Sequence, residues 1–165
     1  MLEVKGLSKG FNDVNAVSDI SFSVDSNSYV SLLGASGCGK SVLLRLVAGL
    51  LAPDEGAVYL NGIDITLQPC NERQIGFVQQ KYALFPHLNV YDNIAFGLRH
   101  RTVDPITDEA IVKKEVFEII ELVGLQGQEY KMTGQISGGQ KQRVSLSRTL
   151  VTKPSICLLD EPLGA

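Results

Sequence analysis

A glycine-rich run has the residue types and spacing of a phosphate-binding loop. The run Gly34-Ala35-Ser36-Gly37-Cys38-Gly39-Lys40-Ser41 fits the pattern G-x-x-x-x-G-K-[ST] and lies between two apolar stretches. Such glycines let backbone N–H groups close around a phosphate, and a following helix adds the positive end of its dipole. We expect Lys40 to reach the β- and γ-phosphates of a nucleotide and Ser41 to ligate Mg²⁺. The alternative, a glycine-rich turn with a chance lysine, is disfavoured by the strand–loop–helix context.

Two adjacent acids, Asp160 and Glu161, follow the apolar run Ile156–Leu159. A buried strand that ends in carboxylates places them at the carboxyl edge of a sheet, where ligands bind in α/β folds. We expect Asp160 to hold Mg²⁺ and Glu161 to act as general base toward an attacking water. The alternative is a strand followed by solvated acids, which the phosphate-binding loop disfavours.

The run Ser137-Gly138-Gly139-Gln140 opens a predicted helix and forms a second candidate anion site. A serine cap and two glycines leave N–H groups at a helix N-terminus free to bind an anion. Because the chain already has one phosphate-binding loop, a second anion site suggests a phosphate shared between two subunits. An ordinary capped helix with a glycine-rich entry is the alternative.

The elements around these motifs alternate between strands and helices. Hydrophobic patterning predicts strands at 14–24, 29–33, 75–78 and 156–159, a hairpin at 57–65 that turns at Asn61-Gly62, and helices at 40–51, 106–123 and 138 to about 151. Helices that cover a mostly parallel sheet, the α/β class, satisfy this order.

Composition excludes several classes of protein. A net charge of -3 disfavours non-specific binding of nucleic acid, so no nucleic-acid partner is expected. No apolar run is long enough to span a bilayer, and the first residues lack the pattern of a signal peptide, so a cytoplasmic chain is expected. The three cysteines are far apart, which indicates neither a disulfide framework nor a zinc site.

The run Gln135-Ile136-Ser137-Gly138-Gly139-Gln140 resembles the LSGGQ signature of ABC ATPases. With the other two motifs, the chain resembles the ATP-binding subunit of a bacterial-type ABC importer over nearly all of its length. The resemblance implies a partial ATP-binding domain at 1–165. By the same resemblance, this domain is expected to contain a P-loop NTPase (RecA-like) core at about 25–80 and 150–165, an antiparallel β subdomain, and a helical signature subdomain at about 85–145. It implies ATP and Mg²⁺ as ligands, ATP hydrolysis coupled to transmembrane transport, and a dimer in which each signature completes the partner's site.

Other positions gain roles from the same resemblance. Gln80 matches the Q-loop glutamine that contacts Mg²⁺ or the attacking water, although the neighbouring Gln79 is an alternative. Phe11 matches the aromatic that stacks on adenine, although a phenylalanine in a strand is as often part of a core. Val42 stands in the nucleotide-binding loop where the family usually has a hydroxyl, so one contact to the α-phosphate is expected to be lost. Ser145, Ser147 and Thr149 stand where the family often has small alanines, and each can bond back to the backbone of its own helix.

The chain stops soon after Glu161, with Leu163-Gly164-Ala165 matching the start of the family's D-loop. The family continues with a D-loop aspartate and a switch histidine. The sequence is therefore expected to be a C-terminally truncated fragment of a longer subunit or a decayed copy, poorly active alone.

Residues 82–98, from Tyr82 to Leu98, resemble the part of importer ATPases that faces the membrane subunits, and they look most like the polyamine importers. Sulfate, iron(III), molybdate and sugar importers share much of this run. The resemblance implies transmembrane permease partners and a place on the inner face of the cell membrane. A truncated nucleotide-binding module without turnover and a soluble, non-transport ABC ATPase remain as alternatives.

Overall fold

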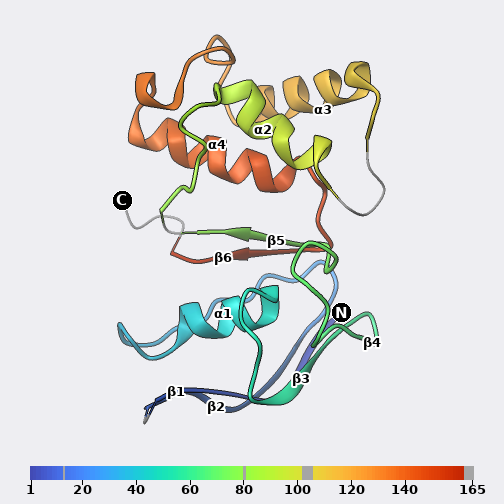
Figure 1. The fold of residues 1–165 in the computed structure, drawn as a ribbon, viewed down its shortest axis with the longest axis vertical. Helices are drawn as coiled ribbons and strands as arrows, with labels where there is room; N and C mark the ends of the chain where they lie inside the picture. Colours follow the sequence, from blue (N-terminus) through green and yellow to red (C-terminus); the bar gives the residue numbers. More distant parts are fainter. Residues whose placement is uncertain (13, 80, 102–105, 162–165) are drawn as a thin grey trace. The chain divides into compact units, whose positions relative to one another are not determined.

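The chain forms both strands and helices, which confirms an α/β fold (Figure 1). Its described strands form a four-stranded antiparallel sheet and one parallel pair, so the mostly parallel sheet predicted from the order of elements is wrong. The computed structural model describes residues 1–165 apart from 13, 80, 102–105 and 162–165. The chain divides into two units, Met1–Arg73 and Gln74–Ala165. Among the described helices, none has both the length and the apolar character needed to cross a bilayer.

The first unit is built on a four-stranded antiparallel sheet in the order β2-β1-β3-β4. Its strands are β1 (Leu2–Phe11), β2 (Val14–Val24), β3 (Glu55–Leu60) and β4 (Ile63–Asp64). Leu2 and Val4 of β1 are buried, as the period-2 patterning of a one-sided sheet requires. Leu7 is buried as well, three positions later, because the pairing with β2 is irregular between Val4 and Leu7. The predicted hairpin is present, and Asn61 and Gly62 have φ values of 53° and 80° as a tight type I′ turn demands.

Helix α1 (Lys40–Ala48) follows the phosphate-binding loop in the same unit. Four apolar side chains of its inner face are buried: Leu43, Leu46, Val47 and Ala48. The helix ends at Gly49, whose φ of 77° is accessible to glycine at little cost and whose N–H bonds back to Leu46 O. It therefore stops three residues earlier than the apolar pattern alone predicts.

The prediction of a strand at residues 29–33 is wrong, because this run is not a strand in the structure. Within the described part of the first unit, the four strands pair with one another and none pairs with this run. Tyr29 and Leu33 are 84% and 92% exposed. An apolar run becomes a strand only when a neighbouring backbone satisfies its N–H and C=O groups, and that pairing cannot be read from the run itself.

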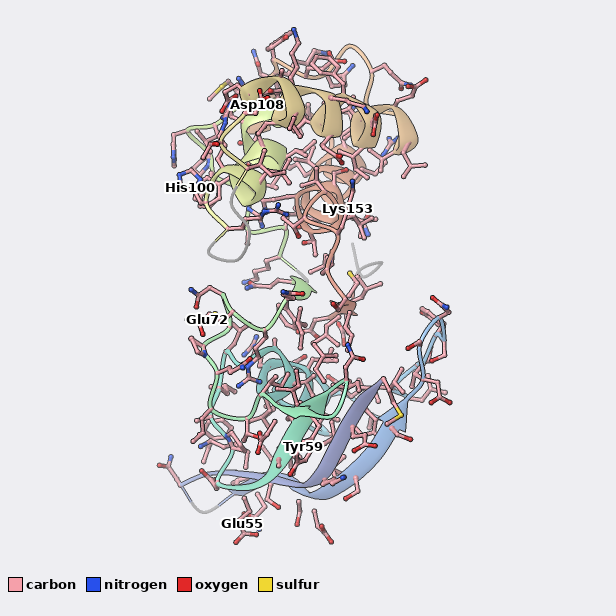
Figure 2. The ribbon with its side chains drawn as sticks, turned by 90° about the vertical axis from the view of Figure 1, so that its right-hand side faces the viewer. Glu55, Tyr59, Glu72, His100, Asp108 and Lys153 are labelled. Atoms are coloured by element: carbon pink, nitrogen blue, oxygen red, sulfur yellow. The ribbon has the colours of Figure 1, made fainter. Side chains whose placement is uncertain are left out.

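The second unit carries three α-helices around one apolar core: α2 (Val90–Arg99), α3 (Glu109–Leu122) and α4 (Gly138–Leu150). Asp108 caps α3 at its start and His100 caps α2 at its end, and both are labelled in Figure 2. Lys153, also labelled there, follows α4 and pairs with Glu115 of α3 at 2.7 Å. The predicted helices α3 and α4 are present.

Helix α2 was not predicted, although the sequence contains its signal. Asn89 accepts a hydrogen bond from Asp92 N at 2.7 Å and so caps the helix, while Val90, Ile94 and Leu98 recur at helical spacing and are buried.

Two parallel strands complete the second unit, β5 (Ile75–Val78) and β6 (Ile156–Leu159), at the predicted residues. Val78 pairs with Leu159, so both strands end at the same edge. The chain leaves β5 into Gln79 and leaves β6 into Asp160 and Glu161. The two acids predicted to act on Mg²⁺ and water therefore follow the carboxyl end of β6, beside that of β5.

Candidate functional site

The phosphate-binding loop lies exposed at the N-terminal end of α1. The ammonium of Lys40 folds back across the loop and donates to Gly34 O at 2.7 Å and Ala35 O at 2.8 Å. Cys38 N donates to Ala35 O at 3.3 Å and closes a turn around Ser36 and Gly37. The loop thus holds the positive charge of Lys40 against its own backbone, where an incoming phosphate can take the place of the carbonyls as acceptor.

One glycine of the loop, Gly39, is required by its shape, whereas the contact at Gly34 involves only the end of the Cys38 side chain. Gly39 has a φ of 95°, and a Cβ there would collide with the carbonyl oxygen of Ala16 on β2. A Cβ at Gly34 would come within 2.7 Å of the Cys38 sulfur. Gly39 is also the N-cap of α1 and has no side chain to cap the first turn. The start of α1, with Lys40 and Ser41, keeps the positive end of the helix dipole directed at the loop.

The acids at the end of β6 differ in environment. Asp160 is buried, and its N–H donates to Val78 O at 2.9 Å, so the β5–β6 ladder fixes its backbone. Glu161 is exposed and has a φ of 48°, a left-handed conformation that costs a non-glycine residue about 1 kcal/mol. Strained residues of this kind cluster at functional sites. Asp160 is thus buried and Glu161 exposed, and their division into a Mg²⁺ ligand and a base stays a prediction.

The second anion site stands at the N-terminus of α4. Ser137 Oγ accepts from Gln140 N at 3.3 Å, and Gln140 Oε1 accepts from Ser137 N at 2.8 Å, which forms a capping box. Ser137, Gly138 and Gly139 are exposed, and a Cβ at Gly139 would meet no heavy atom within 4 Å. The start of this helix is therefore rigid and open toward a ligand.

The remaining predicted site residues occupy different positions. Phe11 ends β1 with 44% of its surface exposed, and Lys9 Nζ lies 5.8 Å from its ring centroid. This placement excludes a core role and leaves its ring accessible. Val42 is half-buried in the first turn of α1. Gln80 and the D-loop residues 163–165 lie outside the described residues.

The segment after Gln80 is held by Asn93, a buried residue of α2 that the sequence analysis missed. Its Nδ2 group donates to Phe85 O, Leu88 O and Asn89 O at 2.9–3.1 Å, and its Oδ1 accepts from Phe85 N at 2.9 Å. One amide thus satisfies four backbone groups of an irregular segment. A single asparagine within an apolar helix is the only sequence signal for this role.

Arg73 is the second anchoring residue that the sequence analysis missed. It is 3% exposed, and its guanidinium donates to Leu46 O and Val47 O at the end of α1 and to Thr66 O and Gln68 O. Burial lowers its pKa from the usual arginine range. A cation at a helix C-terminus complements the dipole. Arg73 therefore fixes the end of α1 that is opposite the phosphate-binding loop. This arginine belongs to no recognisable sequence motif.

The hydroxyls of Ser145, Ser147 and Thr149 on α4 behave differently from one another, and of these three only that of Thr149 bonds back to its own helix. Thr149 Oγ1 bonds back to Ser145 O at 3.4 Å. Ser145 Oγ instead donates to Tyr82 O at 2.9 Å. Ser147 is fully buried, and within the described residues its Oγ has no hydrogen-bond partner. Tertiary packing, which the helix sequence alone does not specify, decides between these outcomes.

We therefore expect Ser147→Ala to raise the free energy of unfolding by about 1 kcal/mol, since it removes an unsatisfied buried hydroxyl. Ser145→Ala is the matched control, because it gains the same helix propensity but breaks a buried hydrogen bond and should lower stability by about 1 kcal/mol. Urea unfolding of both variants measures the difference. Equal changes in the two variants would contradict this assignment.

Ser41 and Asp160, two of the predicted Mg²⁺ ligands, each carry an oxygen donor. Among the described residues, no group of three or more His, Cys, Asp and Glu side chains could form an all-protein metal cage. Mg²⁺ in phosphoryl-transfer sites is held by one or two protein oxygens together with phosphates and water. A hydroxyl at Ser41 and a buried carboxylate at Asp160 are oxygen donors of this type.

Comparison with known proteins agrees with these features. Residues 17–164 match the family model described as ABC transporter. The chain is 51% identical over 162 residues to the sulfate/thiosulfate import ATP-binding protein of Gloeobacter violaceus, which covers 98% of this chain and 46% of that protein. It is 44% identical over 164 residues to the spermidine/putrescine import ATP-binding protein of Fusobacterium nucleatum, which covers 99% of this chain and 43% of that protein. The chain thus spans about half the length of these relatives.

Solved structures show the same fold. A dimeric bacterial ABC transporter cassette superposes with a TM-score of 0.90 at 29% identity, covering 100% of this chain and 75% of that one. A dimeric cassette in a post-hydrolysis state, bound to ADP and Pi, gives a TM-score of 0.88 at 29% identity with the same coverage. The fold is therefore that of an ABC cassette, mixed α/β with an antiparallel sheet and helices.

Proposed function

This chain belongs to the ABC transporter family, and from this premise we propose that it is the ATP-binding and ATP-hydrolysing part of an import complex. The observation that carries the proposal is the phosphate-binding loop, in which Lys40 bridges Gly34 O and Ala35 O in front of an α1 N-terminus that only glycine can cap. A loop of this kind at a helix N-terminus binds phosphates, and its sequence motif is the one typical of nucleotide-binding loops, which supports the proposal.

Each site residue has a role in this proposal. The loop from Gly34 to Val42 wraps the phosphates, Lys40 contacts the β- and γ-phosphates, and Phe11 stacks on the adenine. Ser41, Asp160 and Gln80 hold Mg²⁺, which neutralises charge that develops on the transferred phosphoryl group. Glu161 takes a proton from the attacking water, and Gln80 orients that water.

A second copy of the chain completes each site. Ser137, Gly138 and Gly139 are exposed at the start of α4 and, with Gln140, form a candidate anion site, as expected if its ligand arrives with a partner subunit. Two solved cassettes that share this fold are dimeric, which supports the same arrangement here. A symmetric dimer then contains two composite sites, each with one phosphate-binding loop and one signature.

The importer class is favoured over the two alternatives, a module without turnover and a soluble ATPase, because the similar relatives are import proteins. The proposed permease contact is the docking segment, residues 82–98, whose aromatic side chains suit a hydrophobic partner surface. This contact would place the subunit on the cytoplasmic face of the membrane. A polyamine was predicted as the solute, and sulfate has equal support from the relatives, so the solute class stays a prediction.

The proposed composite site is tested by Gly139→Asp. The chain itself has room for this side chain, and an acid in the first turn of α4 suits the helix dipole, so the fold should persist. A carboxylate there would repel the partner's nucleotide phosphates, and we expect Mg·ATP turnover to fall by about 100-fold or more while ATP affinity of the monomer is unchanged.

The control for this variant is Gly134→Asp, another position where a Cβ would meet no heavy atom within 4 Å. We expect its turnover to stay within about twofold of the unmodified protein. Phosphate release and calorimetry measure the two quantities. Full turnover in Gly139→Asp would remove the signature from the nucleotide site.

A further inference from the structure

Tyr82 connects the docking segment to the signature end of α4. Its carbonyl oxygen accepts from Ser145 Oγ at 2.9 Å and from Arg148 Nη2 at 3.4 Å, both on α4. The next carbonyl, Ala83 O, accepts from Arg148 Nη1 at 2.7 Å. Three hydrogen bonds from one helix therefore fix the backbone at Tyr82 and Ala83.

The strength of this attachment shows in two further features. Ala83 has a φ of 47°, a left-handed conformation that an alanine adopts only where its surroundings hold it. Burial lowers the pKa of Arg148, whose guanidinium also lies 5.4 Å from the centroid of the Phe85 ring. A half-buried cation is thus used to hold the backbone of this segment rather than to pair with a carboxylate. The position of Tyr82 relative to α4 is therefore well defined.

The side chain of Tyr82 extends from this anchor toward the first turn of α4. Its hydroxyl lies 3.8 Å from the position that a Cβ at Gly138 would occupy. The anchor at Ser145 is about two helical turns further along, so the side chain runs beside α4 to the signature. Within the described part of the chain, the hydroxyl has no hydrogen-bond partner, which leaves its O–H available as a donor.

We propose that the Tyr82 hydroxyl is an additional phosphate-binding group of the signature, donating a hydrogen bond to the nucleotide that the partner subunit presents to Ser137–Gly139. The inference rests on the proposed function, since it needs a nucleotide shared between two copies. A phenol O–H is a strong donor to a phosphate oxygen. The hydrogen bonds that attach the Tyr82 backbone to α4 order this residue before the ligand arrives. Because Tyr82 also begins the docking segment, a partner that displaces this segment would withdraw the hydroxyl from the nucleotide.

The test separates this contact from nucleotide binding by the monomer. In a Glu161→Gln background, which is expected to retain ATP, Tyr82→Phe removes one oxygen and leaves the backbone anchors intact. We expect the dimer Kd in Mg·ATP to rise about tenfold, or about 1.4 kcal/mol, while the ATP Kd of the monomer is unchanged. Sedimentation measures the first quantity and calorimetry the second.

Tyr130→Phe is the matched control, because Tyr130 is an exposed tyrosine of the same unit. Its dimer Kd should equal that of the background variant. If the background dimerises and Tyr82→Phe dimerises equally tightly, the role of Tyr82 is overturned and the proposed function stands. If the background itself fails to dimerise with Mg·ATP, the proposed function is overturned and this inference with it.

Discussion

Lys40→Ala should lose ATP affinity by at least about 100-fold, close to 3 kcal/mol. The substitution removes the charge-assisted contacts to the β- and γ-phosphates, each of which contributes about 1.5–3 kcal/mol. It also removes the bonds to Gly34 O and Ala35 O that hold the loop in shape. Both losses act at the same place, so this is the largest binding effect expected of any single substitution.

Calorimetry with ATP on the purified protein measures this effect. Lys113→Ala is the control, since Lys113 is an exposed lysine of α3 and its loss changes the net charge equally. The control should bind ATP as the unmodified protein does. Equal affinities in all three proteins would show that the glycine-rich loop is not the phosphate site.

Glu161→Gln should slow phosphate release by about 10²–10⁴-fold, the usual contribution of a general base. The amide keeps the size of the side chain and its hydrogen bonding but cannot take a proton from water. ATP binding should persist, and stalled ATP between two copies should hold them together as a dimer. Asp160→Asn should behave differently, because weaker Mg²⁺ binding reduces both affinity and turnover.

Size-exclusion chromatography in Mg·ATP, run beside a phosphate-release assay, distinguishes the two acids. Glu161→Gln should elute as a dimer, whereas Asp160→Asn should remain a monomer at the same ATP concentration. A Glu161→Gln protein that hydrolyses ATP at the unmodified rate would exclude Glu161 as the base.

Local chemistry made most of the fold predictable. The hairpin turn at Asn61-Gly62 needs positive φ at two successive residues, and an Asn-Gly pair is typical of such a turn. Strands β5 and β6 are short apolar runs bounded by polar residues, and they form where the pattern places them. The capping box of α4 pairs Ser137 with Gln140, three residues apart, so the start of that helix could also be predicted from the sequence.

What the sequence did not reveal depends on contacts between distant residues. The run at 29–33 has strand composition, but a strand requires a hydrogen-bonding neighbour. Arg73 reads as a surface arginine, yet it is buried on the carbonyl groups that end α1. The hydroxyl of Ser145 could bond within its own helix, and in the structure it bonds to Tyr82 O, 63 positions earlier in the chain.

The residues of the candidate site also fall into those that the sequence identifies and those that only the structure reveals. Lys40 and Ser137 were identified by motif, because loop geometry and helix capping restrict the residues that can serve there. Tyr82 and Asn93 carry no motif, since their roles follow from where packed helices place them. Their contribution therefore becomes visible only in three dimensions.

Complementation between two inactive variants tests the composite site most directly. Lys40→Ala disables the phosphate-binding loop, and Gly139→Asp disables the signature. When the two proteins are mixed in equal amounts, half of the dimers are mixed, and each mixed dimer has one intact site made from the unmodified loop of one copy and the unmodified signature of the other. We predict that the mixture regains about a quarter of the unmodified rate of phosphate release, as symmetric pairing of subunits requires. A mixture as inactive as either variant alone would contradict a site shared between two copies.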